Sequence, residues 1–203
     1  MTQLTKTLLV AGIILVAGVS VGTSAFTSAT VERQADANVV ADENGLLGLT
    51  DGNSGNLVYQ NAADQLAINF TQGTATGANT DALFELGNPA APGTSKAFQV
   101  TNNDAESHQI TAAYTLDADD GNTVANLEFQ VYDNTGALVG TVTEEGQTVS
   151  MDAAAAETYD VVVVVDTGHG TGTDTLTSAK DLSGTLALTI DDVDEGGTVS
   201  DGS

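Results

Sequence analysis

The sequence of 203 residues has no cysteine, no tryptophan, two prolines and only four lysine or arginine residues. Without cysteine the chain can form neither disulfide bonds nor thiolate zinc sites, and it has no cysteine nucleophile. With so few cations it has no basic patch that could bind the phosphates of nucleic acids or the anionic head groups of lipids. The sequence therefore excludes nucleic acids and charged membrane surfaces as partners.

Acidic residues dominate the charge instead. The chain has 28 aspartates and glutamates and a formal net charge of −24 at pH 7. An acidic chain can be disordered, but 41% of these residues are hydrophobic and many lie in alternating runs that are typical of strands. We therefore expect a folded protein with an acidic surface. So many acids with so little lysine are typical of a halophilic organism, where salt screens the repulsion between like charges.

The first 25 residues have the pattern of a secretory signal peptide. Lys6 is their one charged residue, residues 8–22 form an apolar run, and Thr23-Ser24-Ala25 offers small residues for cleavage between Ala25 and Phe26. A permanent membrane helix needs about 20 apolar residues, so a retained anchor is the less favoured alternative. We expect a secreted protein, and loss of Lys6 with the leader would change the net charge from −24 to −25.

A long alternating pattern follows the predicted cleavage site. One parity of residues 29–41 carries small apolar side chains and the other carries polar ones, which predicts a strand with one apolar face. This strand is much longer than the average of about five or six residues. It can be the first strand of the chain's own domain, or a donor strand that enters a groove of another subunit. The donor-strand residues of the apolar parity, which only the arginine interrupts, are Ala29, Val31, Arg33, Ala35, Ala37 and Val39.

The rest of the chain predicts an all-β fold. Residues 42–55 have the composition of turns, whereas five consecutive valines at 161–165 predict a central strand buried on both faces. About nine or ten short strands with almost no helical periodicity favour an antiparallel β-sandwich of jelly-roll or Greek-key type. The predicted strands are 57–59, 66–71, 83–86, 95–101, 108–116, 124–132, 138–142, 149–151, 159–165 and 186–190.

Asn69 is a candidate glycosylation site, because Asn69-Phe70-Thr71 is an N-glycosylation sequon in a chain predicted to be exported. Sequons also occur by chance, and the pattern of the strand predicts that Phe70 is buried. The modification of Asn69 therefore stays a candidate.

Few residues could carry out catalysis. The two histidines, His108 and His169, lie in separate segments, and the sequence has no HExxH, Gly-x-Ser-x-Gly or EF-hand pattern. Acidic clusters at 117–122 and 191–195 could offer oxygen ligands to Ca²⁺, but solvated turns are the favoured interpretation in a chain this acidic. We expect no enzyme activity, no catalytic residue, no metal site and no cofactor.

Three segments resemble the TasA/camelysin superfamily, and within it archaeal members that include bundling pilins. They are the junction at 8–34, Pro92-Gly93-Thr94-Ser95-Lys96-Ala97-Phe98-Gln99-Val100-Thr101-Asn102-Asn103, and Ser183-Gly184-Thr185-Leu186-Ala187-Leu188-Thr189-Ile190. The resemblance implies a jelly-roll subunit of an extracellular fibre, in which the N-terminal strand of one subunit completes a sheet of its neighbour. Camelysin itself is labelled a metalloprotease, but this chain shows no zinc-ligand pattern, so we do not transfer that activity.

The sequence thus predicts four parts: a signal peptide at 1–25, a donor-type strand at 26–41, a β-sandwich domain at 42–191 and an acidic disordered tail at 192–203. The predicted function is that of a secreted structural subunit of a cell-surface fibre, such as a bundling pilus or biofilm matrix that supports cell adhesion. Its partners would be copies of itself, and it would not contact the membrane after signal removal. The alternative is a monomeric secreted β-sandwich module that binds Ca²⁺ or glycans.

Overall fold

The structure is a computed structural model that describes residues 42–53, 55–71, 77–118, 124–169, 176 and 180–192. The chain divides into two compact units, Met1–Asn38 and Val39–Ser203, and every described residue belongs to the second. The predicted signal peptide, its cleavage site between Ala25 and Phe26, and the predicted donor strand therefore lie outside the described residues. The predicted tail also lies outside them, except for Asp192, which belongs to the last strand.

A six-stranded antiparallel sheet forms the larger layer of the domain. Its order is β1-β5-β10-β7-β8, with β4 also paired to β10. Val161 of β10 pairs with β5 and β7, and Val163 pairs with β4 and β7, so β4 and β5 follow one another along the same edge of β10. The strands are β1 (Leu47–Asp51), β4 (Leu83–Leu86), β5 (Phe98–Asn102), β7 (Leu127–Tyr132), β8 (Leu138–Thr143) and β10 (Thr158–Asp166).

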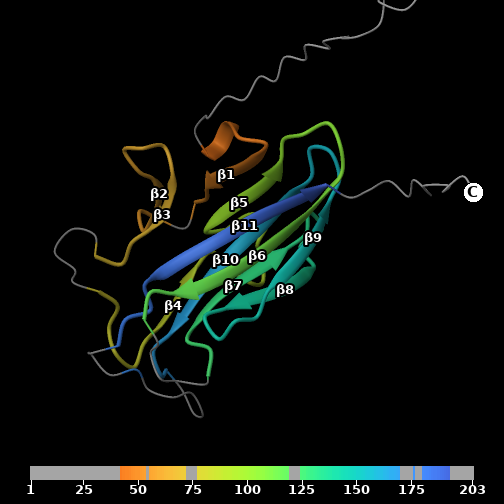
Figure 1. Ribbon diagram of the computed structural model, residues 1–203. Coiled ribbons are helices and arrows are strands. Elements are labelled where there is room, and N and C mark those ends of the chain that lie inside the picture. The colour runs from red at the N-terminus through yellow and green to blue at the C-terminus, as the bar shows by residue number, and fades with distance from the viewer. Residues whose placement is uncertain are drawn as a thin grey trace, which may run out of the picture. The chain divides into compact units, whose positions relative to one another are not determined.

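A three-stranded antiparallel sheet, in the order β11-β6-β9, forms the second layer. Figure 1 shows β6 and β11 crossing in front of the strands of the larger sheet. The strands are β6 (His108–Leu116), β9 (Val149–Ala153) and β11 (Gly184–Asp192). A separate hairpin joins β2 (Val58–Gln60) to β3 (Leu66–Ile68), and a short 3-10 helix, η1 (Asp42–Asn44), precedes β1.

The inward-facing side chains of both sheets form one core. Alternation explains this, because every second residue of β5, β6 and β7 points inward and is apolar. The core residues from the larger sheet include Phe98, Val100, Phe129, Val131, Val161 and Val163, and those from the smaller sheet include Ile110, Ala112, Tyr114, Val149 and Met151. The domain is therefore all-β, with antiparallel sheets packed together as in a β-sandwich.

Strand β10 is central and buried on both faces, as its valine run predicts. Val161, Val163 and Val165 face the core, and Val162 on the opposite face is also fully buried. The loop between β4 and β5 covers that face, because a Cβ on Gly87 would lie 3.0 Å from Cγ2 of Val162. Paired neighbours on both edges and covers on both faces make β10 the most enclosed strand of the domain.

The first strand of the larger sheet differs from the prediction. Residues 42–55 were expected to form turns, but Leu47–Asp51 forms β1 and pairs with β5. Gly48 in this strand packs closely, since a Cβ there would lie 2.6 Å from Nδ2 of Asn103 and 3.2 Å from the carbonyl oxygen of Glu43. Including β1, the described residues form eleven strands instead of the expected nine or ten.

Candidate functional site

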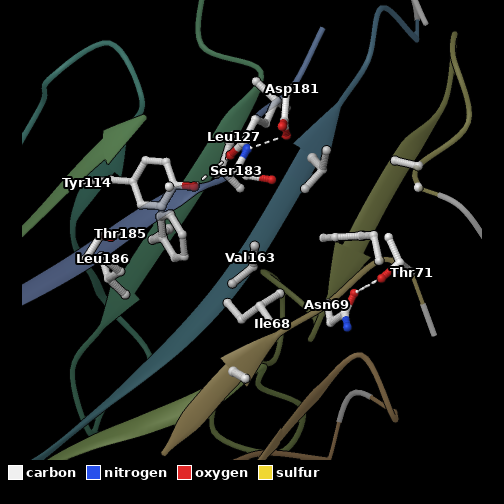
Figure 2. A pocket seen from close by; sticks show the side chains of 18 of the residues that line it. Ile68, Asn69, Thr71, Tyr114, Leu127, Val163, Asp181, Ser183, Thr185 and Leu186 are labelled. Atoms are coloured by element: carbon white, nitrogen blue, oxygen red, sulfur yellow. Dashed lines mark hydrogen bonds between the residues drawn. The ribbon is translucent and has the colours of Figure 1, made fainter. Parts of the chain in front are cut away.

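A groove lies between β11 and the hairpin strand β3, above the larger sheet. Figure 2 shows Val163 of β10 between Leu186 of β11 and Ile68 of β3. The groove has a volume of about 930 Å³, at the upper end of the roughly 300–1,000 Å³ of small-molecule pockets. The residues of the larger sheet that line it are Leu49, Phe98, Leu127, Phe129, Val163 and Val165. All of them are apolar, so this surface would gain from being covered.

Strand β11 forms one side of this groove with an unpaired edge. All nine of its residues pair with β6, and no other strand within the described ranges pairs with it. Leu186, Leu188 and Ile190 face the core but remain only half-buried. An unpaired edge presents backbone N–H and C=O groups that can bind a further strand. The edge and the apolar surface beside it are therefore suited to an extended polypeptide.

Tyr114 and Gly184 hold the start of β11 in place. The hydroxyl of Tyr114 donates a 2.7 Å hydrogen bond to the carbonyl of Leu182. A Cβ on Gly184 would lie 2.2 Å from the carbonyl oxygen of Thr115 and 2.8 Å from the Tyr114 hydroxyl. Burial raises the pKa of Tyr114 to about 12, so its hydroxyl stays a donor at any physiological pH. These contacts fix the side of the groove before any partner binds.

Two charged residues, Lys180 and Asp181, lie at the end of the groove where β11 begins, and both are exposed. The backbone N–H of Ser183 donates a 2.9 Å hydrogen bond to Oδ1 of Asp181 (Figure 2). Hydrogen bonds from the hydroxyl and the N–H of Ser183 hold the pKa of Asp181 below its ordinary value. Among the residues that the structure describes, Asp181 is the one acid that lines the groove, and it forms no ion pair with them.

Asn69, the candidate glycosylation site, lies on the opposite side of the groove, just after β3. Its Oδ1 accepts hydrogen bonds from the N–H of Thr71 at 2.7 Å and from the Thr71 hydroxyl at 2.6 Å (Figure 2). Phe70, which the sequence predicted to be buried, is half-buried, and its ring meets Phe84 edge-on at 5.7 Å. Glycosylation of Asn69 stays a prediction, and a glycan there would stand beside the groove.

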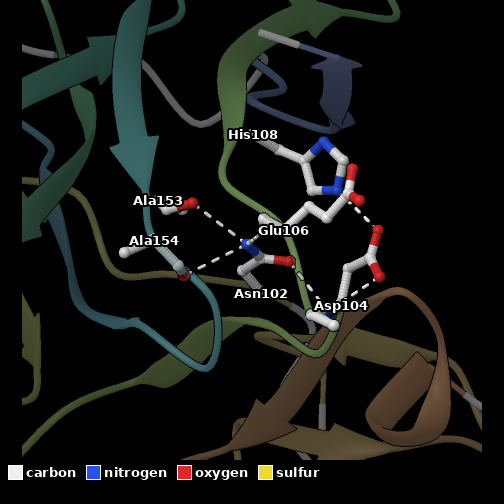
Figure 3. A network of polar contacts seen from close by, with 7 residues as sticks. Asn102, Asp104, Glu106, His108, Ala153 and Ala154 are labelled. Atoms are coloured by element: carbon white, nitrogen blue, oxygen red, sulfur yellow. Dashed lines mark hydrogen bonds and ion pairs between the residues drawn. The ribbon is translucent and has the colours of Figure 1, made fainter. Parts of the chain in front are cut away.

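A buried polar network ties the two sheets together at the other end of β5. Nδ2 of Asn102 donates to the carbonyls of Glu106, Ala153 and Ala154 at 2.8, 3.0 and 3.1 Å (Figure 3). Because Ala153 ends β9, this one side chain links the larger sheet to the smaller one. The sequence did not predict this role, since asparagine at the end of a strand is ordinarily a turn residue.

The two histidines lie at separate places in the fold. His108 begins β6, and its Nε2 lies 2.7 Å from Oδ2 of Asp104 (Figure 3). The hydrogen bond with His108 lowers the pKa of Asp104. His169 is exposed and follows β10, where its N–H donates to Asp166. His108 is thus part of the turn that leads into β6.

Two further acids are buried and paired. Asp160 of β10 forms an ion pair with Lys96 and accepts a 2.9 Å hydrogen bond from Gln99. Oε1 of Glu144 accepts the backbone N–H groups of Asn126 and Leu127, which begin β7. Burial raises the pKa of Glu144 against the opposing effect of these hydrogen bonds. Both acids lie outside the groove.

The described residues contain no group of three or more histidines, aspartates or glutamates that could hold a metal ion. Parts of both acidic clusters, at 119–123 and 193–195, lie outside the described residues. Within the same described ranges, no helix is long and apolar enough to cross a membrane.

The groove is the feature that sequence reasoning missed. Its two sides come from β3 and β11, more than 100 residues apart, and only the fold brings them together. No protein-family model matches the chain, and no curated protein matches it significantly. The likeness to the TasA/camelysin superfamily therefore rests on the three segments quoted above.

Proposed function

We propose that this chain is a secreted structural subunit of an extracellular fibre, of the bundling-pilus or biofilm-matrix kind, with a sandwich of jelly-roll type. In this proposal residues 26–41 of one copy enter the groove of the next and pair with the free edge of β11. The observation that carries the proposal is the unpaired edge of β11 beside an apolar groove.

The dimensions of the two elements support the pairing. A strand rises about 3.3 Å per residue, so the twelve residues of 30–41 would span roughly 40 Å and the nine residues of β11 roughly 30 Å. The predicted strand is thus long enough to pair with the whole of β11. Main-chain hydrogen bonds would supply affinity, and alternate side chains would face the apolar surface.

The side chains also match. The apolar face of the predicted strand carries mostly alanine and valine. These small side chains suit the groove between β11 and β3. Burial of each valine side chain contributes about 1.5–3 kcal/mol, and the half-buried Leu186, Leu188 and Ile68 of the groove would gain further cover. An exposed apolar surface of this size would otherwise favour aggregation.

The geometry of such a contact leads to a fibre. Strand and groove are different surfaces of the same chain, so each copy can donate to one neighbour and accept from another. A head-to-tail contact that does not close on itself produces a filament. The acidic surface would oppose assembly by like-charge repulsion, and high salt would screen that repulsion. Assembly should therefore strengthen as salt concentration rises.

The experiment compares the chain without residues 1–25 with two single substitutions, at high salt and high protein concentration, by electron microscopy and sedimentation. Ala37→Asp puts a charge on the apolar face of the predicted strand, and Asn38→Asp puts the same charge on its polar face. We expect fibres from the unsubstituted chain and from Asn38→Asp, and monomers from Ala37→Asp.

A chain that stays monomeric under all these conditions would refute the fibre proposal. If such a monomer binds Ca²⁺ tightly in a calorimetric titration, the alternative of a secreted binding module is favoured instead. If fibres form equally well from Ala37→Asp, the structural role of the chain stands, but residues 26–41 do not form the contact between copies.

A further inference from the structure

The predicted donor strand contains one residue that the apolar groove does not explain. Arg33 lies on the same parity as Ala29, Val31, Ala35 and Ala37, so it would point into the groove with them. An arginine that is removed from water without a partner is strongly unfavourable, whereas a carboxylate beside it offsets the cost. A groove that accepts this strand therefore needs an acid at one position.

The groove provides one such acid. Of the described residues that line it, only Asp181 carries a negative charge, at the end where β11 begins. Its carboxylate is held by the N–H of Ser183 at 2.9 Å and has no ion pair with a described cation. Hydrogen bonds from Ser183 keep it ionised by lowering its pKa. Asp181 is thus the one anion among the described residues of the groove, and it lies beside the exposed cation Lys180.

We propose that Arg33 of one copy pairs with Asp181 of the next, and that this ion pair sets the register of the donated strand. The inference rests on the proposed function, because it names the contact that aligns residues 26–41 in the groove. Guanidinium and carboxylate groups form two parallel hydrogen bonds in a fixed geometry, so a shift of the strand by two residues would lose both.

The same contact sets the direction of the strand. Along β11, three apolar residues follow the position of Asp181 and face the core: Leu186, Leu188 and Ile190. On the predicted strand, four apolar residues of the inward parity follow Arg33 and only two precede it. The groove is therefore covered best when residues 35–41 lie along β11, with the donated strand parallel to it.

Charge exchange tests the ion pair. We expect Asp181→Lys alone and Arg33→Asp alone to raise the concentration needed for fibre assembly by roughly tenfold or more, and the two together to restore it. Asp191→Lys is the matched control, because it makes the same charge change near the other end of β11 at an exposed residue. It should leave assembly close to that of the unsubstituted chain. Circular dichroism confirms that each variant is folded.

Engineered disulfides test register and direction independently in a chain that has no cysteine of its own. Ser28 and Asn38 each lie five residues from Arg33, on opposite sides of it and on the polar face of the strand. We expect Asn38→Cys to form a disulfide with Ala187→Cys of another copy in assembled fibres, and Ser28→Cys not to do so. A disulfide requires Cα atoms within about 7 Å, so only neighbouring positions can link.

The outcomes separate this inference from the proposed function. Fibres whose assembly is unchanged by either charge reversal would overturn the ion pair and leave the fibre proposal standing. Fibres in which Ser28→Cys links in place of Asn38→Cys would overturn the parallel direction. Absence of fibres from the unsubstituted chain would overturn the inference together with the function on which it rests.

Discussion

Strands β10 and β11 have the same length but opposite surroundings. Both have nine residues. Strand β10 pairs on both edges and is covered on both faces, whereas β11 pairs, among the strands that the structure describes, with β6 alone and keeps its apolar side chains half-buried. The valine run of β10 suits enclosure, and the alternating leucine and threonine of β11 suit a surface with one covered face. The difference makes β10 the enclosed centre of the domain, and β11 is the strand to which the proposed function assigns binding.

The largest expected contrast comes from one aspartate placed in each strand. Val163→Asp would put an unpaired charge at a side chain with no exposure, at a cost above about 4 kcal/mol, and should prevent folding. Leu188→Asp lies at the open edge, where the carboxylate can stay hydrated, and should cost about 1–2 kcal/mol. Urea unfolding at high salt measures both.

Leu188→Asp should fold but fail to assemble, because its charge would face the donated strand. Amide hydrogen exchange adds to the contrast: in the monomer the free-edge amides of β11 should exchange faster than those of β10, and should slow on assembly. Similar losses of stability from the two aspartates would show that β11 is as enclosed as β10.

The next largest loss of stability should come from disruption of the polar network around Asn102, near the start of β10. Asn102→Ala removes the donor to three carbonyls, and buried carbonyls without partners cost about 2–3 kcal/mol. The neighbouring Asn103→Ala is the matched control, because it removes a donor to two carbonyls, of Glu43 and Gly45, at an exposed position. It should cost only about 1 kcal/mol. Thermal unfolding midpoints compare the two. Equal effects would show that Asn102 does not join the sheets.

The buried carboxylate beside β7 predicts a pH dependence. Burial raises the pKa of Glu144 above its ordinary value of 4.5, so the folded state holds this proton more tightly than the unfolded state. The protonated side chain of Glu144 therefore contributes to the stability of the folded state. This contribution is lost as pH rises from 4.5 through the pKa of Glu144 in the folded state. Glutamine in place of Glu144 keeps an Oε1 acceptor for these hydrogen bonds, but its side chain does not ionise.

The free energy of unfolding of Glu144→Gln, minus that of the unsubstituted chain, should therefore increase with pH above 4.5. Urea unfolding at several pH values measures this difference, with Glu145→Gln at an exposed neighbour as the control. A difference that falls with pH would show that the hydrogen bonds from Asn126 and Leu127 outweigh burial.

The smallest effect should be a gain in stability at the turn that enters β10. Ala156 has a φ of 61°, a left-handed conformation that costs about 1 kcal/mol for residues with a Cβ. Ala156→Gly should raise the free energy of unfolding by about 0.5–1 kcal/mol. Ala154→Gly in the same turn is the control and should lower it, since Ala154 has no positive φ. Urea unfolding midpoints distinguish the two signs.

The sequence predicted both the enclosed and the open strand, since 159–165 lies within β10 and 186–190 lies within β11. The valine run at 161–165 and the alternation at 108–116 and 83–86 gave the positions of β10, β6 and β4, because period and β-branching are local properties. The strand at Leu47–Asp51 was missed, since the turn signals at 51–52 and 55–56 stand beside its short apolar patch. The groove could not be predicted, because Ile68, Val163 and Leu188 meet only in the folded domain. The prediction of a donor strand stays a prediction.

The scarcity of lysine has a practical consequence for measurement. The described residues contain two lysines: Lys96, whose side chain is 19% exposed and joined to Asp160, and Lys180, which is exposed at the groove. An amine-reactive dye needs an accessible amine, so it should attach to Lys180 in preference to Lys96. A fluorophore at Lys180 would stand beside the groove and change its emission when the groove fills. The α-amino group of the chain would react as well, so an optical assay of assembly needs that group blocked before Lys180 is labelled.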